Sequence, residues 1–325
     1  VTFGGAVSGT DHSLTVDGLT ALNGGSVNTG NALQHYKGAV TLGAADTTLD
    51  AGTGAVTFDS TIDTGSSVAA ASLTVNSSGA TTFGGAVGDT KALSSVTTNA
   101  GGTLAINGGV VNTTGAQSYG EMTTLGANTT LQGVNVALLA SVDGAYDLTI
   151  NDSGTTVLGG IVGGAQALTK LTTDAAGETH LSGASVHVTT DAVFNDIVKI
   201  FNTVQMQTGG DLRFMQTVDA DATLEVLNSN STTFTGLVTA GTSVVLTDTV
   251  DAHTIAFNGG LTTPTFTVAA EPFALTLRGH VTAANSIHPA NTWAIQRTRR
   301  FTQPDPAMHF QPPRQPTPPH PNQRS

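Results

Sequence analysis

A short phrase that recurs along the chain limits what this sequence can fold into. "TFGGAV" at residues 2–7 returns at 82–87, then as "VLGGIV" at 157–162 and as "TFTGLV" at 233–238. Self-similarity at a nearly fixed spacing, here about 75 to 80 residues, is the signature of a repeat architecture. No linker separates the copies. The sequence therefore predicts four tandem copies, near 1–80, 81–155, 156–231 and 232–290.

A finer period runs inside each copy. Phe58, Leu138 and Phe214 each precede the next "TFGGAV"-type phrase by a shorter interval of about 20 to 25 residues. From Phe83 onward, apolar anchors divide one copy into four uneven steps, at Ile106, Leu125, Leu138 and Leu158. A unit of about 20 residues cannot bury a face alone, but stacked units can.

Composition selects β-structure for these units. The chain has 39 Gly and no Cys, with only 4 Glu and 4 Lys, while Thr and Val are abundant. Because β-branched residues favour a pleated backbone, we predict an all-β parallel β-helix over residues 1–292. At about 4.8 Å per coil, about 14 coils give a rod on the order of 70 Å long.

The same pattern predicts how side chains are placed in each coil. Val, Leu, Ile, Phe and Ala are expected to face inward, and Thr and Ser to face outward. Asn-Gly phrases are expected at the corners, because Gly and Asn tolerate a positive φ. Equivalent residues of successive coils should align, Val on Val and Asn on Asn, the latter as amide ladders.

Two alternatives compete with this prediction. The first is a string of four sandwich domains, which the short internal step and the scarcity of aromatic residues disfavour. The second concerns residues 192–207, where Val193, Ile197, Phe201 and Val204 have a helical spacing. The repeat register instead places Phe194 and Ile200 in strands, and we favour the register.

Residues 293–325 differ from the repeats. They hold 8 of the 11 Pro and carry five Arg against one Asp, a net charge of +4. We expect this tail to be disordered, either as a flexible basic arm or as a non-native C-terminus. Residues 1–292 carry 22 acidic and 6 basic side chains. Such an acidic body disfavours nucleic acid and anionic membranes as partners, and no stretch is apolar enough to span a membrane.

The search for catalytic chemistry yields one candidate group. Lys199 and Arg213 are expected to meet about one coil apart, near Asp196 and Asp211, as a carbohydrate-active site would require. A solvated salt-bridge patch is the simpler interpretation of the same four residues. We therefore predict a protein that is not an enzyme.

Metal and cofactor motifs are weak, and we predict neither a metal nor a cofactor. His180 and His187 would need a third ligand such as Glu178, and their spacing across a turn is irregular. Asp219 and Asp221 share one face, but the Gly-rich calcium-binding repeat is missing. The chain also has no Walker loop.

The phrases "VTLGA" (40–44), "TTLGANTTLQG" (123–133), "VTFGGAV" (1–7) and "LTVN" (73–76) resemble the passenger repeats of large bacterial surface proteins. The family is the filamentous-haemagglutinin-like exoproteins and autotransporter adhesins of Gram-negative bacteria. The resemblance covers about residues 1–290 and implies a right-handed parallel β-helix. It also implies export by an outer-membrane translocator and a location that is secreted or on the cell surface.

The leading functional hypothesis is a non-enzymatic rod that acts in adhesion to host or bacterial cell-surface ligands such as glycans. Many weak contacts along repeated Thr, Asn and Ser faces would supply the binding strength. The alternative is a carbohydrate-active enzyme with a site near residues 196–213. Because the sequence starts within a repeat phrase, we expect a fragment of a longer exoprotein. An exposed end of the rod predicts end-to-end self-association.

Overall fold

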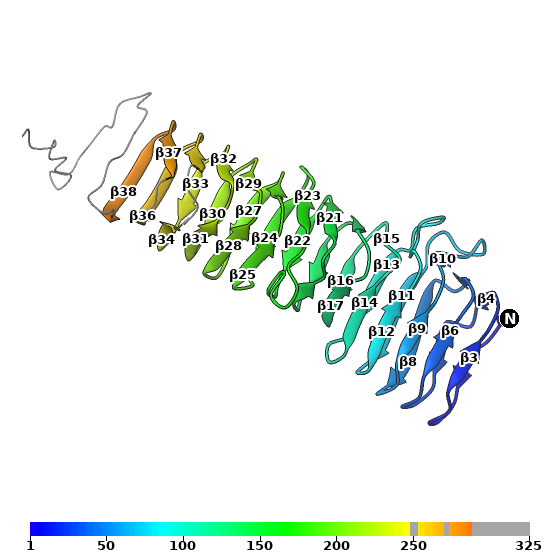
Figure 1. The fold of residues 1–325 in the computed structure, drawn as a ribbon. Helices are drawn as coiled ribbons and strands as arrows, with labels where there is room; N and C mark the ends of the chain where they lie inside the picture. Colours follow the sequence, from blue (N-terminus) through cyan, green and yellow to red (C-terminus); the bar gives the residue numbers. More distant parts are fainter. Residues whose placement is uncertain (248–252, 270–272, 288–325) are drawn as a thin grey trace, which may run out of the picture.

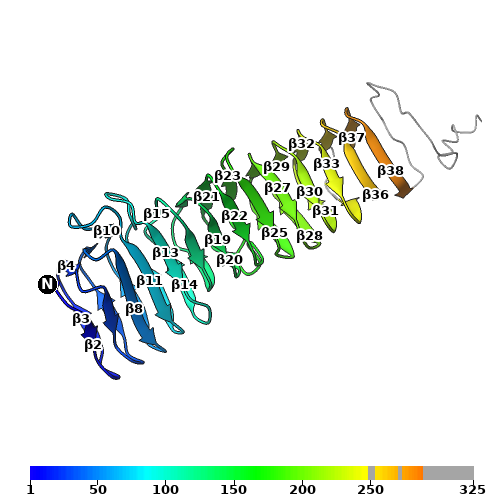
Figure 2. The ribbon, with the colours of Figure 1, turned by 180° about the vertical axis from the view of Figure 1, so that it is seen from behind.

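The computed structural model describes residues 1–247, 253–269 and 273–287, and these wind into a rod of about 14 turns (Figure 1). Every regular element of the described residues is a β-strand, and the strand pairs are parallel. β1 lies at one end of the rod and β38 at the other, as the reverse view also shows (Figure 2). The all-β parallel β-helix predicted from the sequence is confirmed, and the ladders run through all four copies without the breaks that separate sandwich domains would show. The predicted tail, residues 293–325, lies outside the described residues.

Each turn contributes strands to three ladders, which we name faces A, B and C in the order in which the chain meets them. Face A also includes Val87, which bridges Ile62 and Val111. Its strands are β1 (Thr2–Phe3), β4 (Thr20–Leu22), β7 (Val40–Leu42), β10 (Ile62–Thr64), β15 (Val110–Asn112), β18 (Thr129–Gly133), β21 (Asp147–Asp152), β23 (Lys170–Thr173), β26 (Ala192–Phe194), β29 (Asp211–Phe214), β32 (Ser231–Phe234), β35 (Thr254–Phe257) and β37 (Ala274–Leu277).

Face B follows face A in every turn. Its strands are β2 (Val7–Ser8), β5 (Ser26–Asn28), β8 (Asp46–Gly52), β11 (Ser72–Ser77), β13 (Ser95–Thr98), β16 (Gln117–Tyr119), β19 (Val136–Leu138), β22 (Thr155–Leu158), β24 (Glu178–Leu181), β27 (Ile197–Ile200), β30 (Val218–Ala220), β33 (Val238–Ala240), and the first halves of β36 (Leu261–Val268) and β38 (Val281–Ile287).

Face C completes the turn, and Val162 bridges Val142 and Val186 within it. Its strands are β3 (Leu14–Val16), β6 (Gln34–Tyr36), β9 (Val56–Phe58), β12 (Ala80–Phe83), β14 (Thr103–Ile106), β17 (Met122–Leu125), β20 (Val142–Asp143), β25 (Ser185–Val188), β28 (Val204–Thr208), β31 (Thr223–Asn228), β34 (Ser243–Leu246), and the second halves of β36 and β38.

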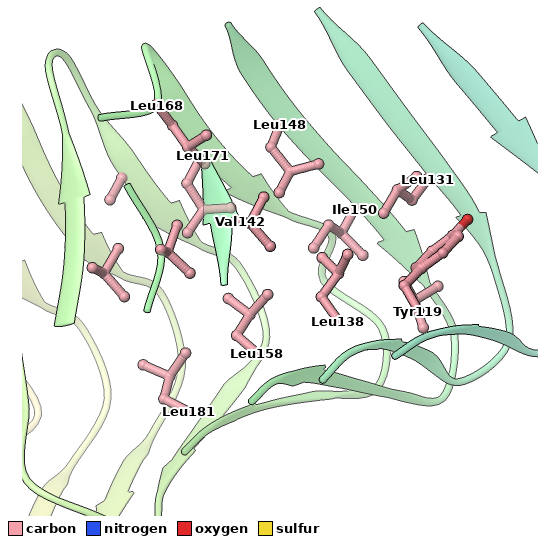
Figure 3. Close-up of a cluster of buried hydrophobic side chains, with 14 of the residues drawn as sticks. Tyr119, Leu131, Leu138, Val142, Leu148, Ile150, Leu158, Leu168, Leu171 and Leu181 are labelled. Atoms are coloured by element: carbon pink, nitrogen blue, oxygen red, sulfur yellow. The ribbon is translucent and has the colours of Figure 1, made fainter. Parts of the chain in front are cut away.

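Alternation of buried and outward residues fixes each strand on its face. β11 and β24, for example, alternate strictly between half-buried and buried residues. Since successive side chains of a strand point to opposite faces, one set fills the interior and the other meets solvent. The inward set forms one continuous core, of which Figure 3 shows the part between Tyr119 and Leu181. Val142, Val162 and Val186 align in register, as the stacking argument predicts.

Threonine is not confined to the outside of the rod. Thr47, Thr113 and Thr179 are buried, so the expectation that threonine faces outward is only partly correct. A buried threonine can bond its hydroxyl to nearby backbone, as Thr113 does by donating to the carbonyl oxygen of Gly115 at 2.7 Å. Its methyl group then packs with the apolar residues, which is why the alternation of the strands continues through such positions.

The long repeat does not contain a whole number of turns. The strands of the "TFGGAV"-type phrase are β1 on face A, β12 on face C, β22 on face B and β32 on face A again. One copy therefore advances the chain by three turns and two further faces. The uneven steps in the sequence have this cause, because Leu125 and Leu138 lie on different faces whereas Leu138 and Leu158 are paired neighbours on face B.

Stacked glycines explain why the chain repeats its corner phrases. A Cβ on Gly108 would lie 2.0 Å from the carbonyl oxygen of Gly85 in the turn below. The same close approach joins one glycine pair in every copy, and a side chain at the upper glycine would collide with backbone. The pairs are Gly24 on Gly5, Gly108 on Gly85, Gly183 on Gly160 and Gly259 on Gly236.

Corner asparagines stack on glycine instead of on each other. The Oδ1 atoms of Asn23 and Asn107 occupy the space where a side chain would stand at Gly43 and Gly126, one turn above. The amide ladder expected from the sequence is therefore wrong at these corners. The physical reason is room: an asparagine at a tight corner needs a neighbour without a Cβ. The positive φ expected there belongs to the following glycines, Gly25 and Gly109, each at φ 74°.

Residues 192–207 form β26, β27 and the start of β28, so the repeat register gave the correct structure and the helical spacing did not. Phe194 and Ile200 point into the core, as their strand positions require. Phe201 follows β27 and is exposed. The apparent helical period arose because apolar residues on or beside three successive strands happen to lie three or four residues apart. These are Val193, Ile197, Phe201 and Val204.

Two buried tyrosines are held by glutamines in equivalent places. Tyr119 donates its hydroxyl to Gln117 Oε1 at 2.8 Å, and Gln117 Nε2 donates to the carbonyl oxygens of Val111 and Gln132. Tyr36 and Gln34 repeat this arrangement at 3.1 Å. In the third copy the corresponding residues are Ala192 and Phe194. The glutamine and the hydroxyl disappear together because either group alone would be a buried polar group without its partner.

Replacing Tyr119 by phenylalanine is expected to lower the free energy of unfolding by about 1–3 kcal/mol, because Gln117 Oε1 loses its donor inside the core. Tyr146→Phe is the matched control, since Tyr146 is 38% exposed, and it should change stability little. Urea unfolding followed by circular dichroism measures both. Equal effects of the two variants would contradict the role given to the buried pair.

Candidate functional site

The structure does not bring Lys199 and Arg213 together. Lys199 lies on β27 of face B, whereas Arg213 lies on β29 of face A. Strands of different faces point their outward side chains in different directions around the rod. The candidate site that combined these two cations with Asp196 and Asp211 is therefore not assembled.

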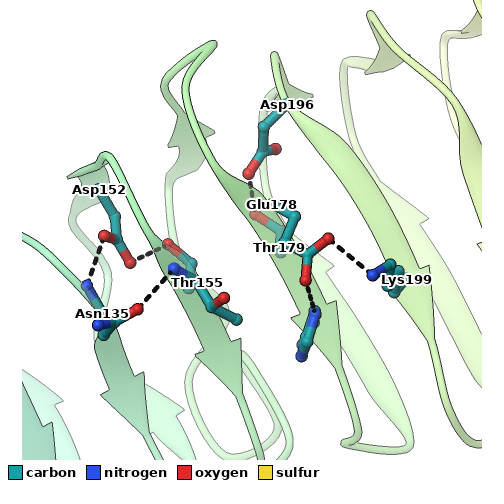
Figure 4. Close-up of polar contacts among 9 residues, drawn as sticks. Asn135, Asp152, Thr155, Glu178, Thr179, Asp196 and Lys199 are labelled. Carbon is teal, nitrogen blue, oxygen red and sulfur yellow. Dashed lines mark hydrogen bonds and ion pairs between the residues drawn. The ribbon is translucent and has the colours of Figure 1, made fainter.

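Asp196 is directed into the rod. Its side chain is buried and accepts hydrogen bonds from the hydroxyls of Thr173 and Thr179, each at 2.7 Å. Figure 4 shows the bond from Thr179. Burial raises the pKa of this carboxyl above 3.8, and the two hydroxyls oppose the rise. Asp196 is thus unable to contact a substrate at the surface.

Arg213 and Asp211 pair with each other on one strand. Both belong to β29, and their side chains lie 2.5 Å apart. Burial acts to raise the pKa of Asp211, but hydrogen bonds from Ser231, Asn230 and Arg213 outweigh it and hold the pKa below 3.8. Asp211 is therefore a surface carboxylate on face A whose oxygens already accept hydrogen bonds from neighbouring side chains.

A different cluster forms on face B, around Glu178. Glu178 Oε1 lies 2.6 Å from His180 Nε2, and Glu178 Oε2 lies 2.8 Å from Lys199 Nζ (Figure 4). The Lys199 hydrogen bond, followed by that of His180, holds the pKa of Glu178 below 4.5. The ring of exposed Phe201 meets the His180 ring edge-on, with centroids 5.0 Å apart. We name Glu178, His180, Lys199 and Phe201 the face-B cluster.

The face-B cluster could have been found from the sequence. Glu178 and His180 alternate on one strand, so they share a face. Lys199 follows His180 by about one coil length, and the ladder register indeed pairs the two residues. Arg213 falls on another face because it follows Lys199 by less than one turn: the register pairs Lys199 with Asp219 and Val193 with Arg213.

The weaker metal hypotheses gain no support. His187 lies on β25 of face C, whereas His180 lies on β24 of face B. Asp219 is exposed on β30, opposite Lys199 in register, and Asp221 is exposed in the following turn. Within the described ranges, no three His, Cys, Asp or Glu side chains gather closely enough to hold a metal ion.

Chemically, the face-B cluster offers one exposed aromatic ring beside an ion-paired carboxylate and a histidine. Such a surface can accept and donate hydrogen bonds, but its carboxylate is already paired with Lys199. Surface pairs of this kind contribute little to stability. The cluster is a place for weak polar contacts.

Comparison with family models, with curated proteins and with solved structures finds no match to this chain. Among the residues that the structure describes, no helix has the length and hydropathy needed to cross a membrane. The rod itself is therefore the basis on which a function can be proposed.

Proposed function

We propose that this protein is a structural rod that acts in adhesion, secreted by or displayed on a Gram-negative bacterium. The observation that supports adhesion is the alignment of outward threonines along the ladders. Thr48, Thr74 and Thr97 lie in register on face B, and each is at least partly exposed. A row of polar side chains at the interstrand spacing offers repeated, nearly identical contacts to a ligand.

A second row repeats the first on another side of the rod. Thr130, Thr149 and Thr172 lie in register on face A. Thr149 and Thr172 are the counterparts of Thr74 and Thr97 in the next copy of the repeat, so the two rows are copies of one surface. Because each repeat advances by three turns and two faces, equivalent rows point in different directions. Multivalent binding to flexible cell-surface chains such as glycans suits this arrangement better than docking on one flat partner.

The export route and the class of protein belong to the same proposal. The repeat style resembles filamentous-haemagglutinin-like exoproteins and autotransporter passengers, and a long chain without cysteine is suited to crossing membranes unfolded. An outer-membrane translocator would be the partner for export.

Substitution of the threonine rows tests adhesion. The full chain, labelled with a fluorophore, is applied to epithelial cell monolayers and to bacterial cells. Replacing Thr48, Thr74 and Thr97 by alanine should weaken retention partially, and replacing both rows should weaken it more than the sum of the two single-row losses. Unchanged retention in the two-row variant would contradict the proposal.

The enzyme alternative is tested in parallel by replacing Lys199 and Arg213 together. We expect no loss of adhesion in the double variant, and no sugar products from acidic polysaccharides with either the unmodified chain or the variant. Loss of measurable sugar cleavage in a folded double variant would instead establish the carbohydrate-active function.

A further inference from the structure

Glu121 is buried at a corner of the rod, between β16 on face B and β17 on face C. It is 2% exposed, and neither of its carboxyl oxygens accepts a hydrogen bond within normal geometry from the described residues. The hydroxyls of Thr81 and Thr98 face this carboxyl and are buried without another partner among those residues. A charged carboxylate in such a place would lose its hydration and gain little in return.

The third copy has a carboxyl at the same position. Asp196 is the counterpart of Glu121 in the repeat, and Thr173 is the counterpart of Thr98. Thr173 donates to Asp196, and the second donor is Thr179, whose counterpart in the second copy is an apolar leucine.

The longer side chain of Glu121 suits its different donors. In the second copy Leu104 stands where the third copy has Thr179, so this position offers no hydroxyl. Thr81, which pairs with Leu104 in register on the next strand of the ladder, offers one instead. Glu121 is one methylene longer than Asp196, so it can face this more distant hydroxyl. Both corners thus set a buried carboxyl against two threonine hydroxyls.

The surroundings of both carboxyls lack a compensating positive charge. Around Glu121, burial is the dominant influence and raises the pKa, while Thr98 and Thr81 oppose it. Around Asp196, burial again dominates, Thr179, Thr173 and its own backbone N–H oppose it, and the negative charge of Asp174 adds to the rise. Among the described residues, neither carboxyl has a Lys, Arg or His acting on it.

Another buried carboxyl shows what a fully hydrogen-bonded one looks like in this fold. Asp152 accepts hydrogen bonds from the backbone N–H groups of Asn135, Val136 and Gly154, and from the hydroxyl of Thr156. Figure 4 shows the bond from Asn135. Four donors replace the water that a carboxylate loses on burial. Glu121 has no comparable set of donors among the described residues.

We propose that folding of the rod takes up a proton at Glu121 and at Asp196, so that these two corners stabilise the rod more strongly in acid than at neutral pH. Both carboxyls are neutral in the closed turns and charged in the unfolded chain at neutral pH. This pH dependence of stability is independent of what the rod binds.

The sign of the pH dependence follows from linkage. A carboxyl whose pKa is higher in the folded than in the unfolded state contributes stability that is fully present below the unfolded value, 4.5 for Glu121 and 3.8 for Asp196. That contribution is lost as the pH rises through the folded value. The urea concentration at the unfolding midpoint of the wild-type rod should therefore decrease as the pH rises from about 5 to about 8.

Three variants of the full chain separate these corners from the general repulsion within an acidic protein. Glu121→Gln should raise the urea midpoint at about pH 8 and flatten its dependence on pH. Asp196→Asn should flatten the pH dependence in the same way, because the neutral amide needs no proton. Glu225→Gln is the matched control, since Glu225 lies on the surface beside Gln205, and it should keep the wild-type slope.

Two results would overturn the proposal. One is a Glu121→Gln variant that keeps the full wild-type slope, or is less stable than wild type at about pH 8 while equally stable at about pH 5. The second is independent of any variant: infrared spectra of the wild-type rod at neutral pH should show the carbonyl band of a protonated carboxyl that vanishes on unfolding. If that band is missing, the carboxyls are charged in the fold and the proposed proton uptake does not occur.

Discussion

Replacing Phe214 by alanine is expected to lower the free energy of unfolding of the rod by about 4 kcal/mol. Phe214 is fully buried and stacks between Phe194 and Phe234, with ring centroids 5.1 and 4.9 Å apart and rings inclined by 6° and 4°. Phe257 extends the stack, with its ring centroid 4.5 Å from that of Phe234. Truncation would leave a cavity and also remove two aromatic contacts, each of about 0.5–1.5 kcal/mol. Urea unfolding monitored by circular dichroism measures the loss.

Phe201→Ala is the control for the Phe214 prediction. It removes the same side chain from a nearby part of the chain, but Phe201 is 43% exposed, so the change should be small. Because each turn of a solenoid contacts only its neighbours, the Phe214 variant should also open locally before the whole rod unfolds. Hydrogen exchange that is fastest in β26, β29 and β32 would show this. Equal stability of the two variants would mean that the stack does not support these turns.

Replacing Gly108 by alanine is expected to lower the free energy of unfolding by about 3 kcal/mol, although only one methyl group is added. The new Cβ would lie 2.0 Å from both the carbonyl carbon and the carbonyl oxygen of Gly85. Backbone atoms at that distance cannot turn aside as a flexible side chain can. The two turns must separate, which weakens the parallel hydrogen bonds on either side of the corner.

Gly5→Ala provides the comparison for Gly108→Ala. Gly5 occupies the same place in the repeat phrase as Gly85, but a Cβ on it would have no heavy atom within 4 Å. We therefore expect a change close to zero, measured by the same urea unfolding. A large loss in Gly5→Ala, or none in Gly108→Ala, would show that corner glycines are retained for a reason other than close stacking.

The stacked corners also bear on the proposed role in adhesion. Since the repeat is selected by contacts between consecutive turns, its outward residues are free to differ from copy to copy. Thr74 and Thr149 correspond, yet the equivalent position in the next copy is Glu225, on face C. The same scaffold thus carries different surfaces on its three faces, a property suited to contacts with several kinds of ligand.

Much of this fold could be predicted from the sequence because the repeat records stacking directly. The correspondence of Phe194 and Ile200 with Tyr119 and Leu125 was enough to place β26 and β27 against a competing helical period. The expectation that Lys199 and Arg213 meet was wrong, because they lie on different faces. Asp196 appeared as a surface carboxylate near Lys199, whereas the structure buries it beside threonine hydroxyls.

The sequence by itself predicted a parallel β-helix of short coils, since periodic apolar residues and glycine corners at short intervals favour stacked coils over separate sandwich domains. Only the tertiary structure decided which residues share a face. Turns of unequal length make one repeat three turns and two faces long, and this number cannot be derived from a local pattern. The register that results sets the corner at Glu121 against hydroxyls from β12 on face C and β13 on face B. Contacts between turns depend on the accumulated rotation of the chain, and that rotation exists only in three dimensions.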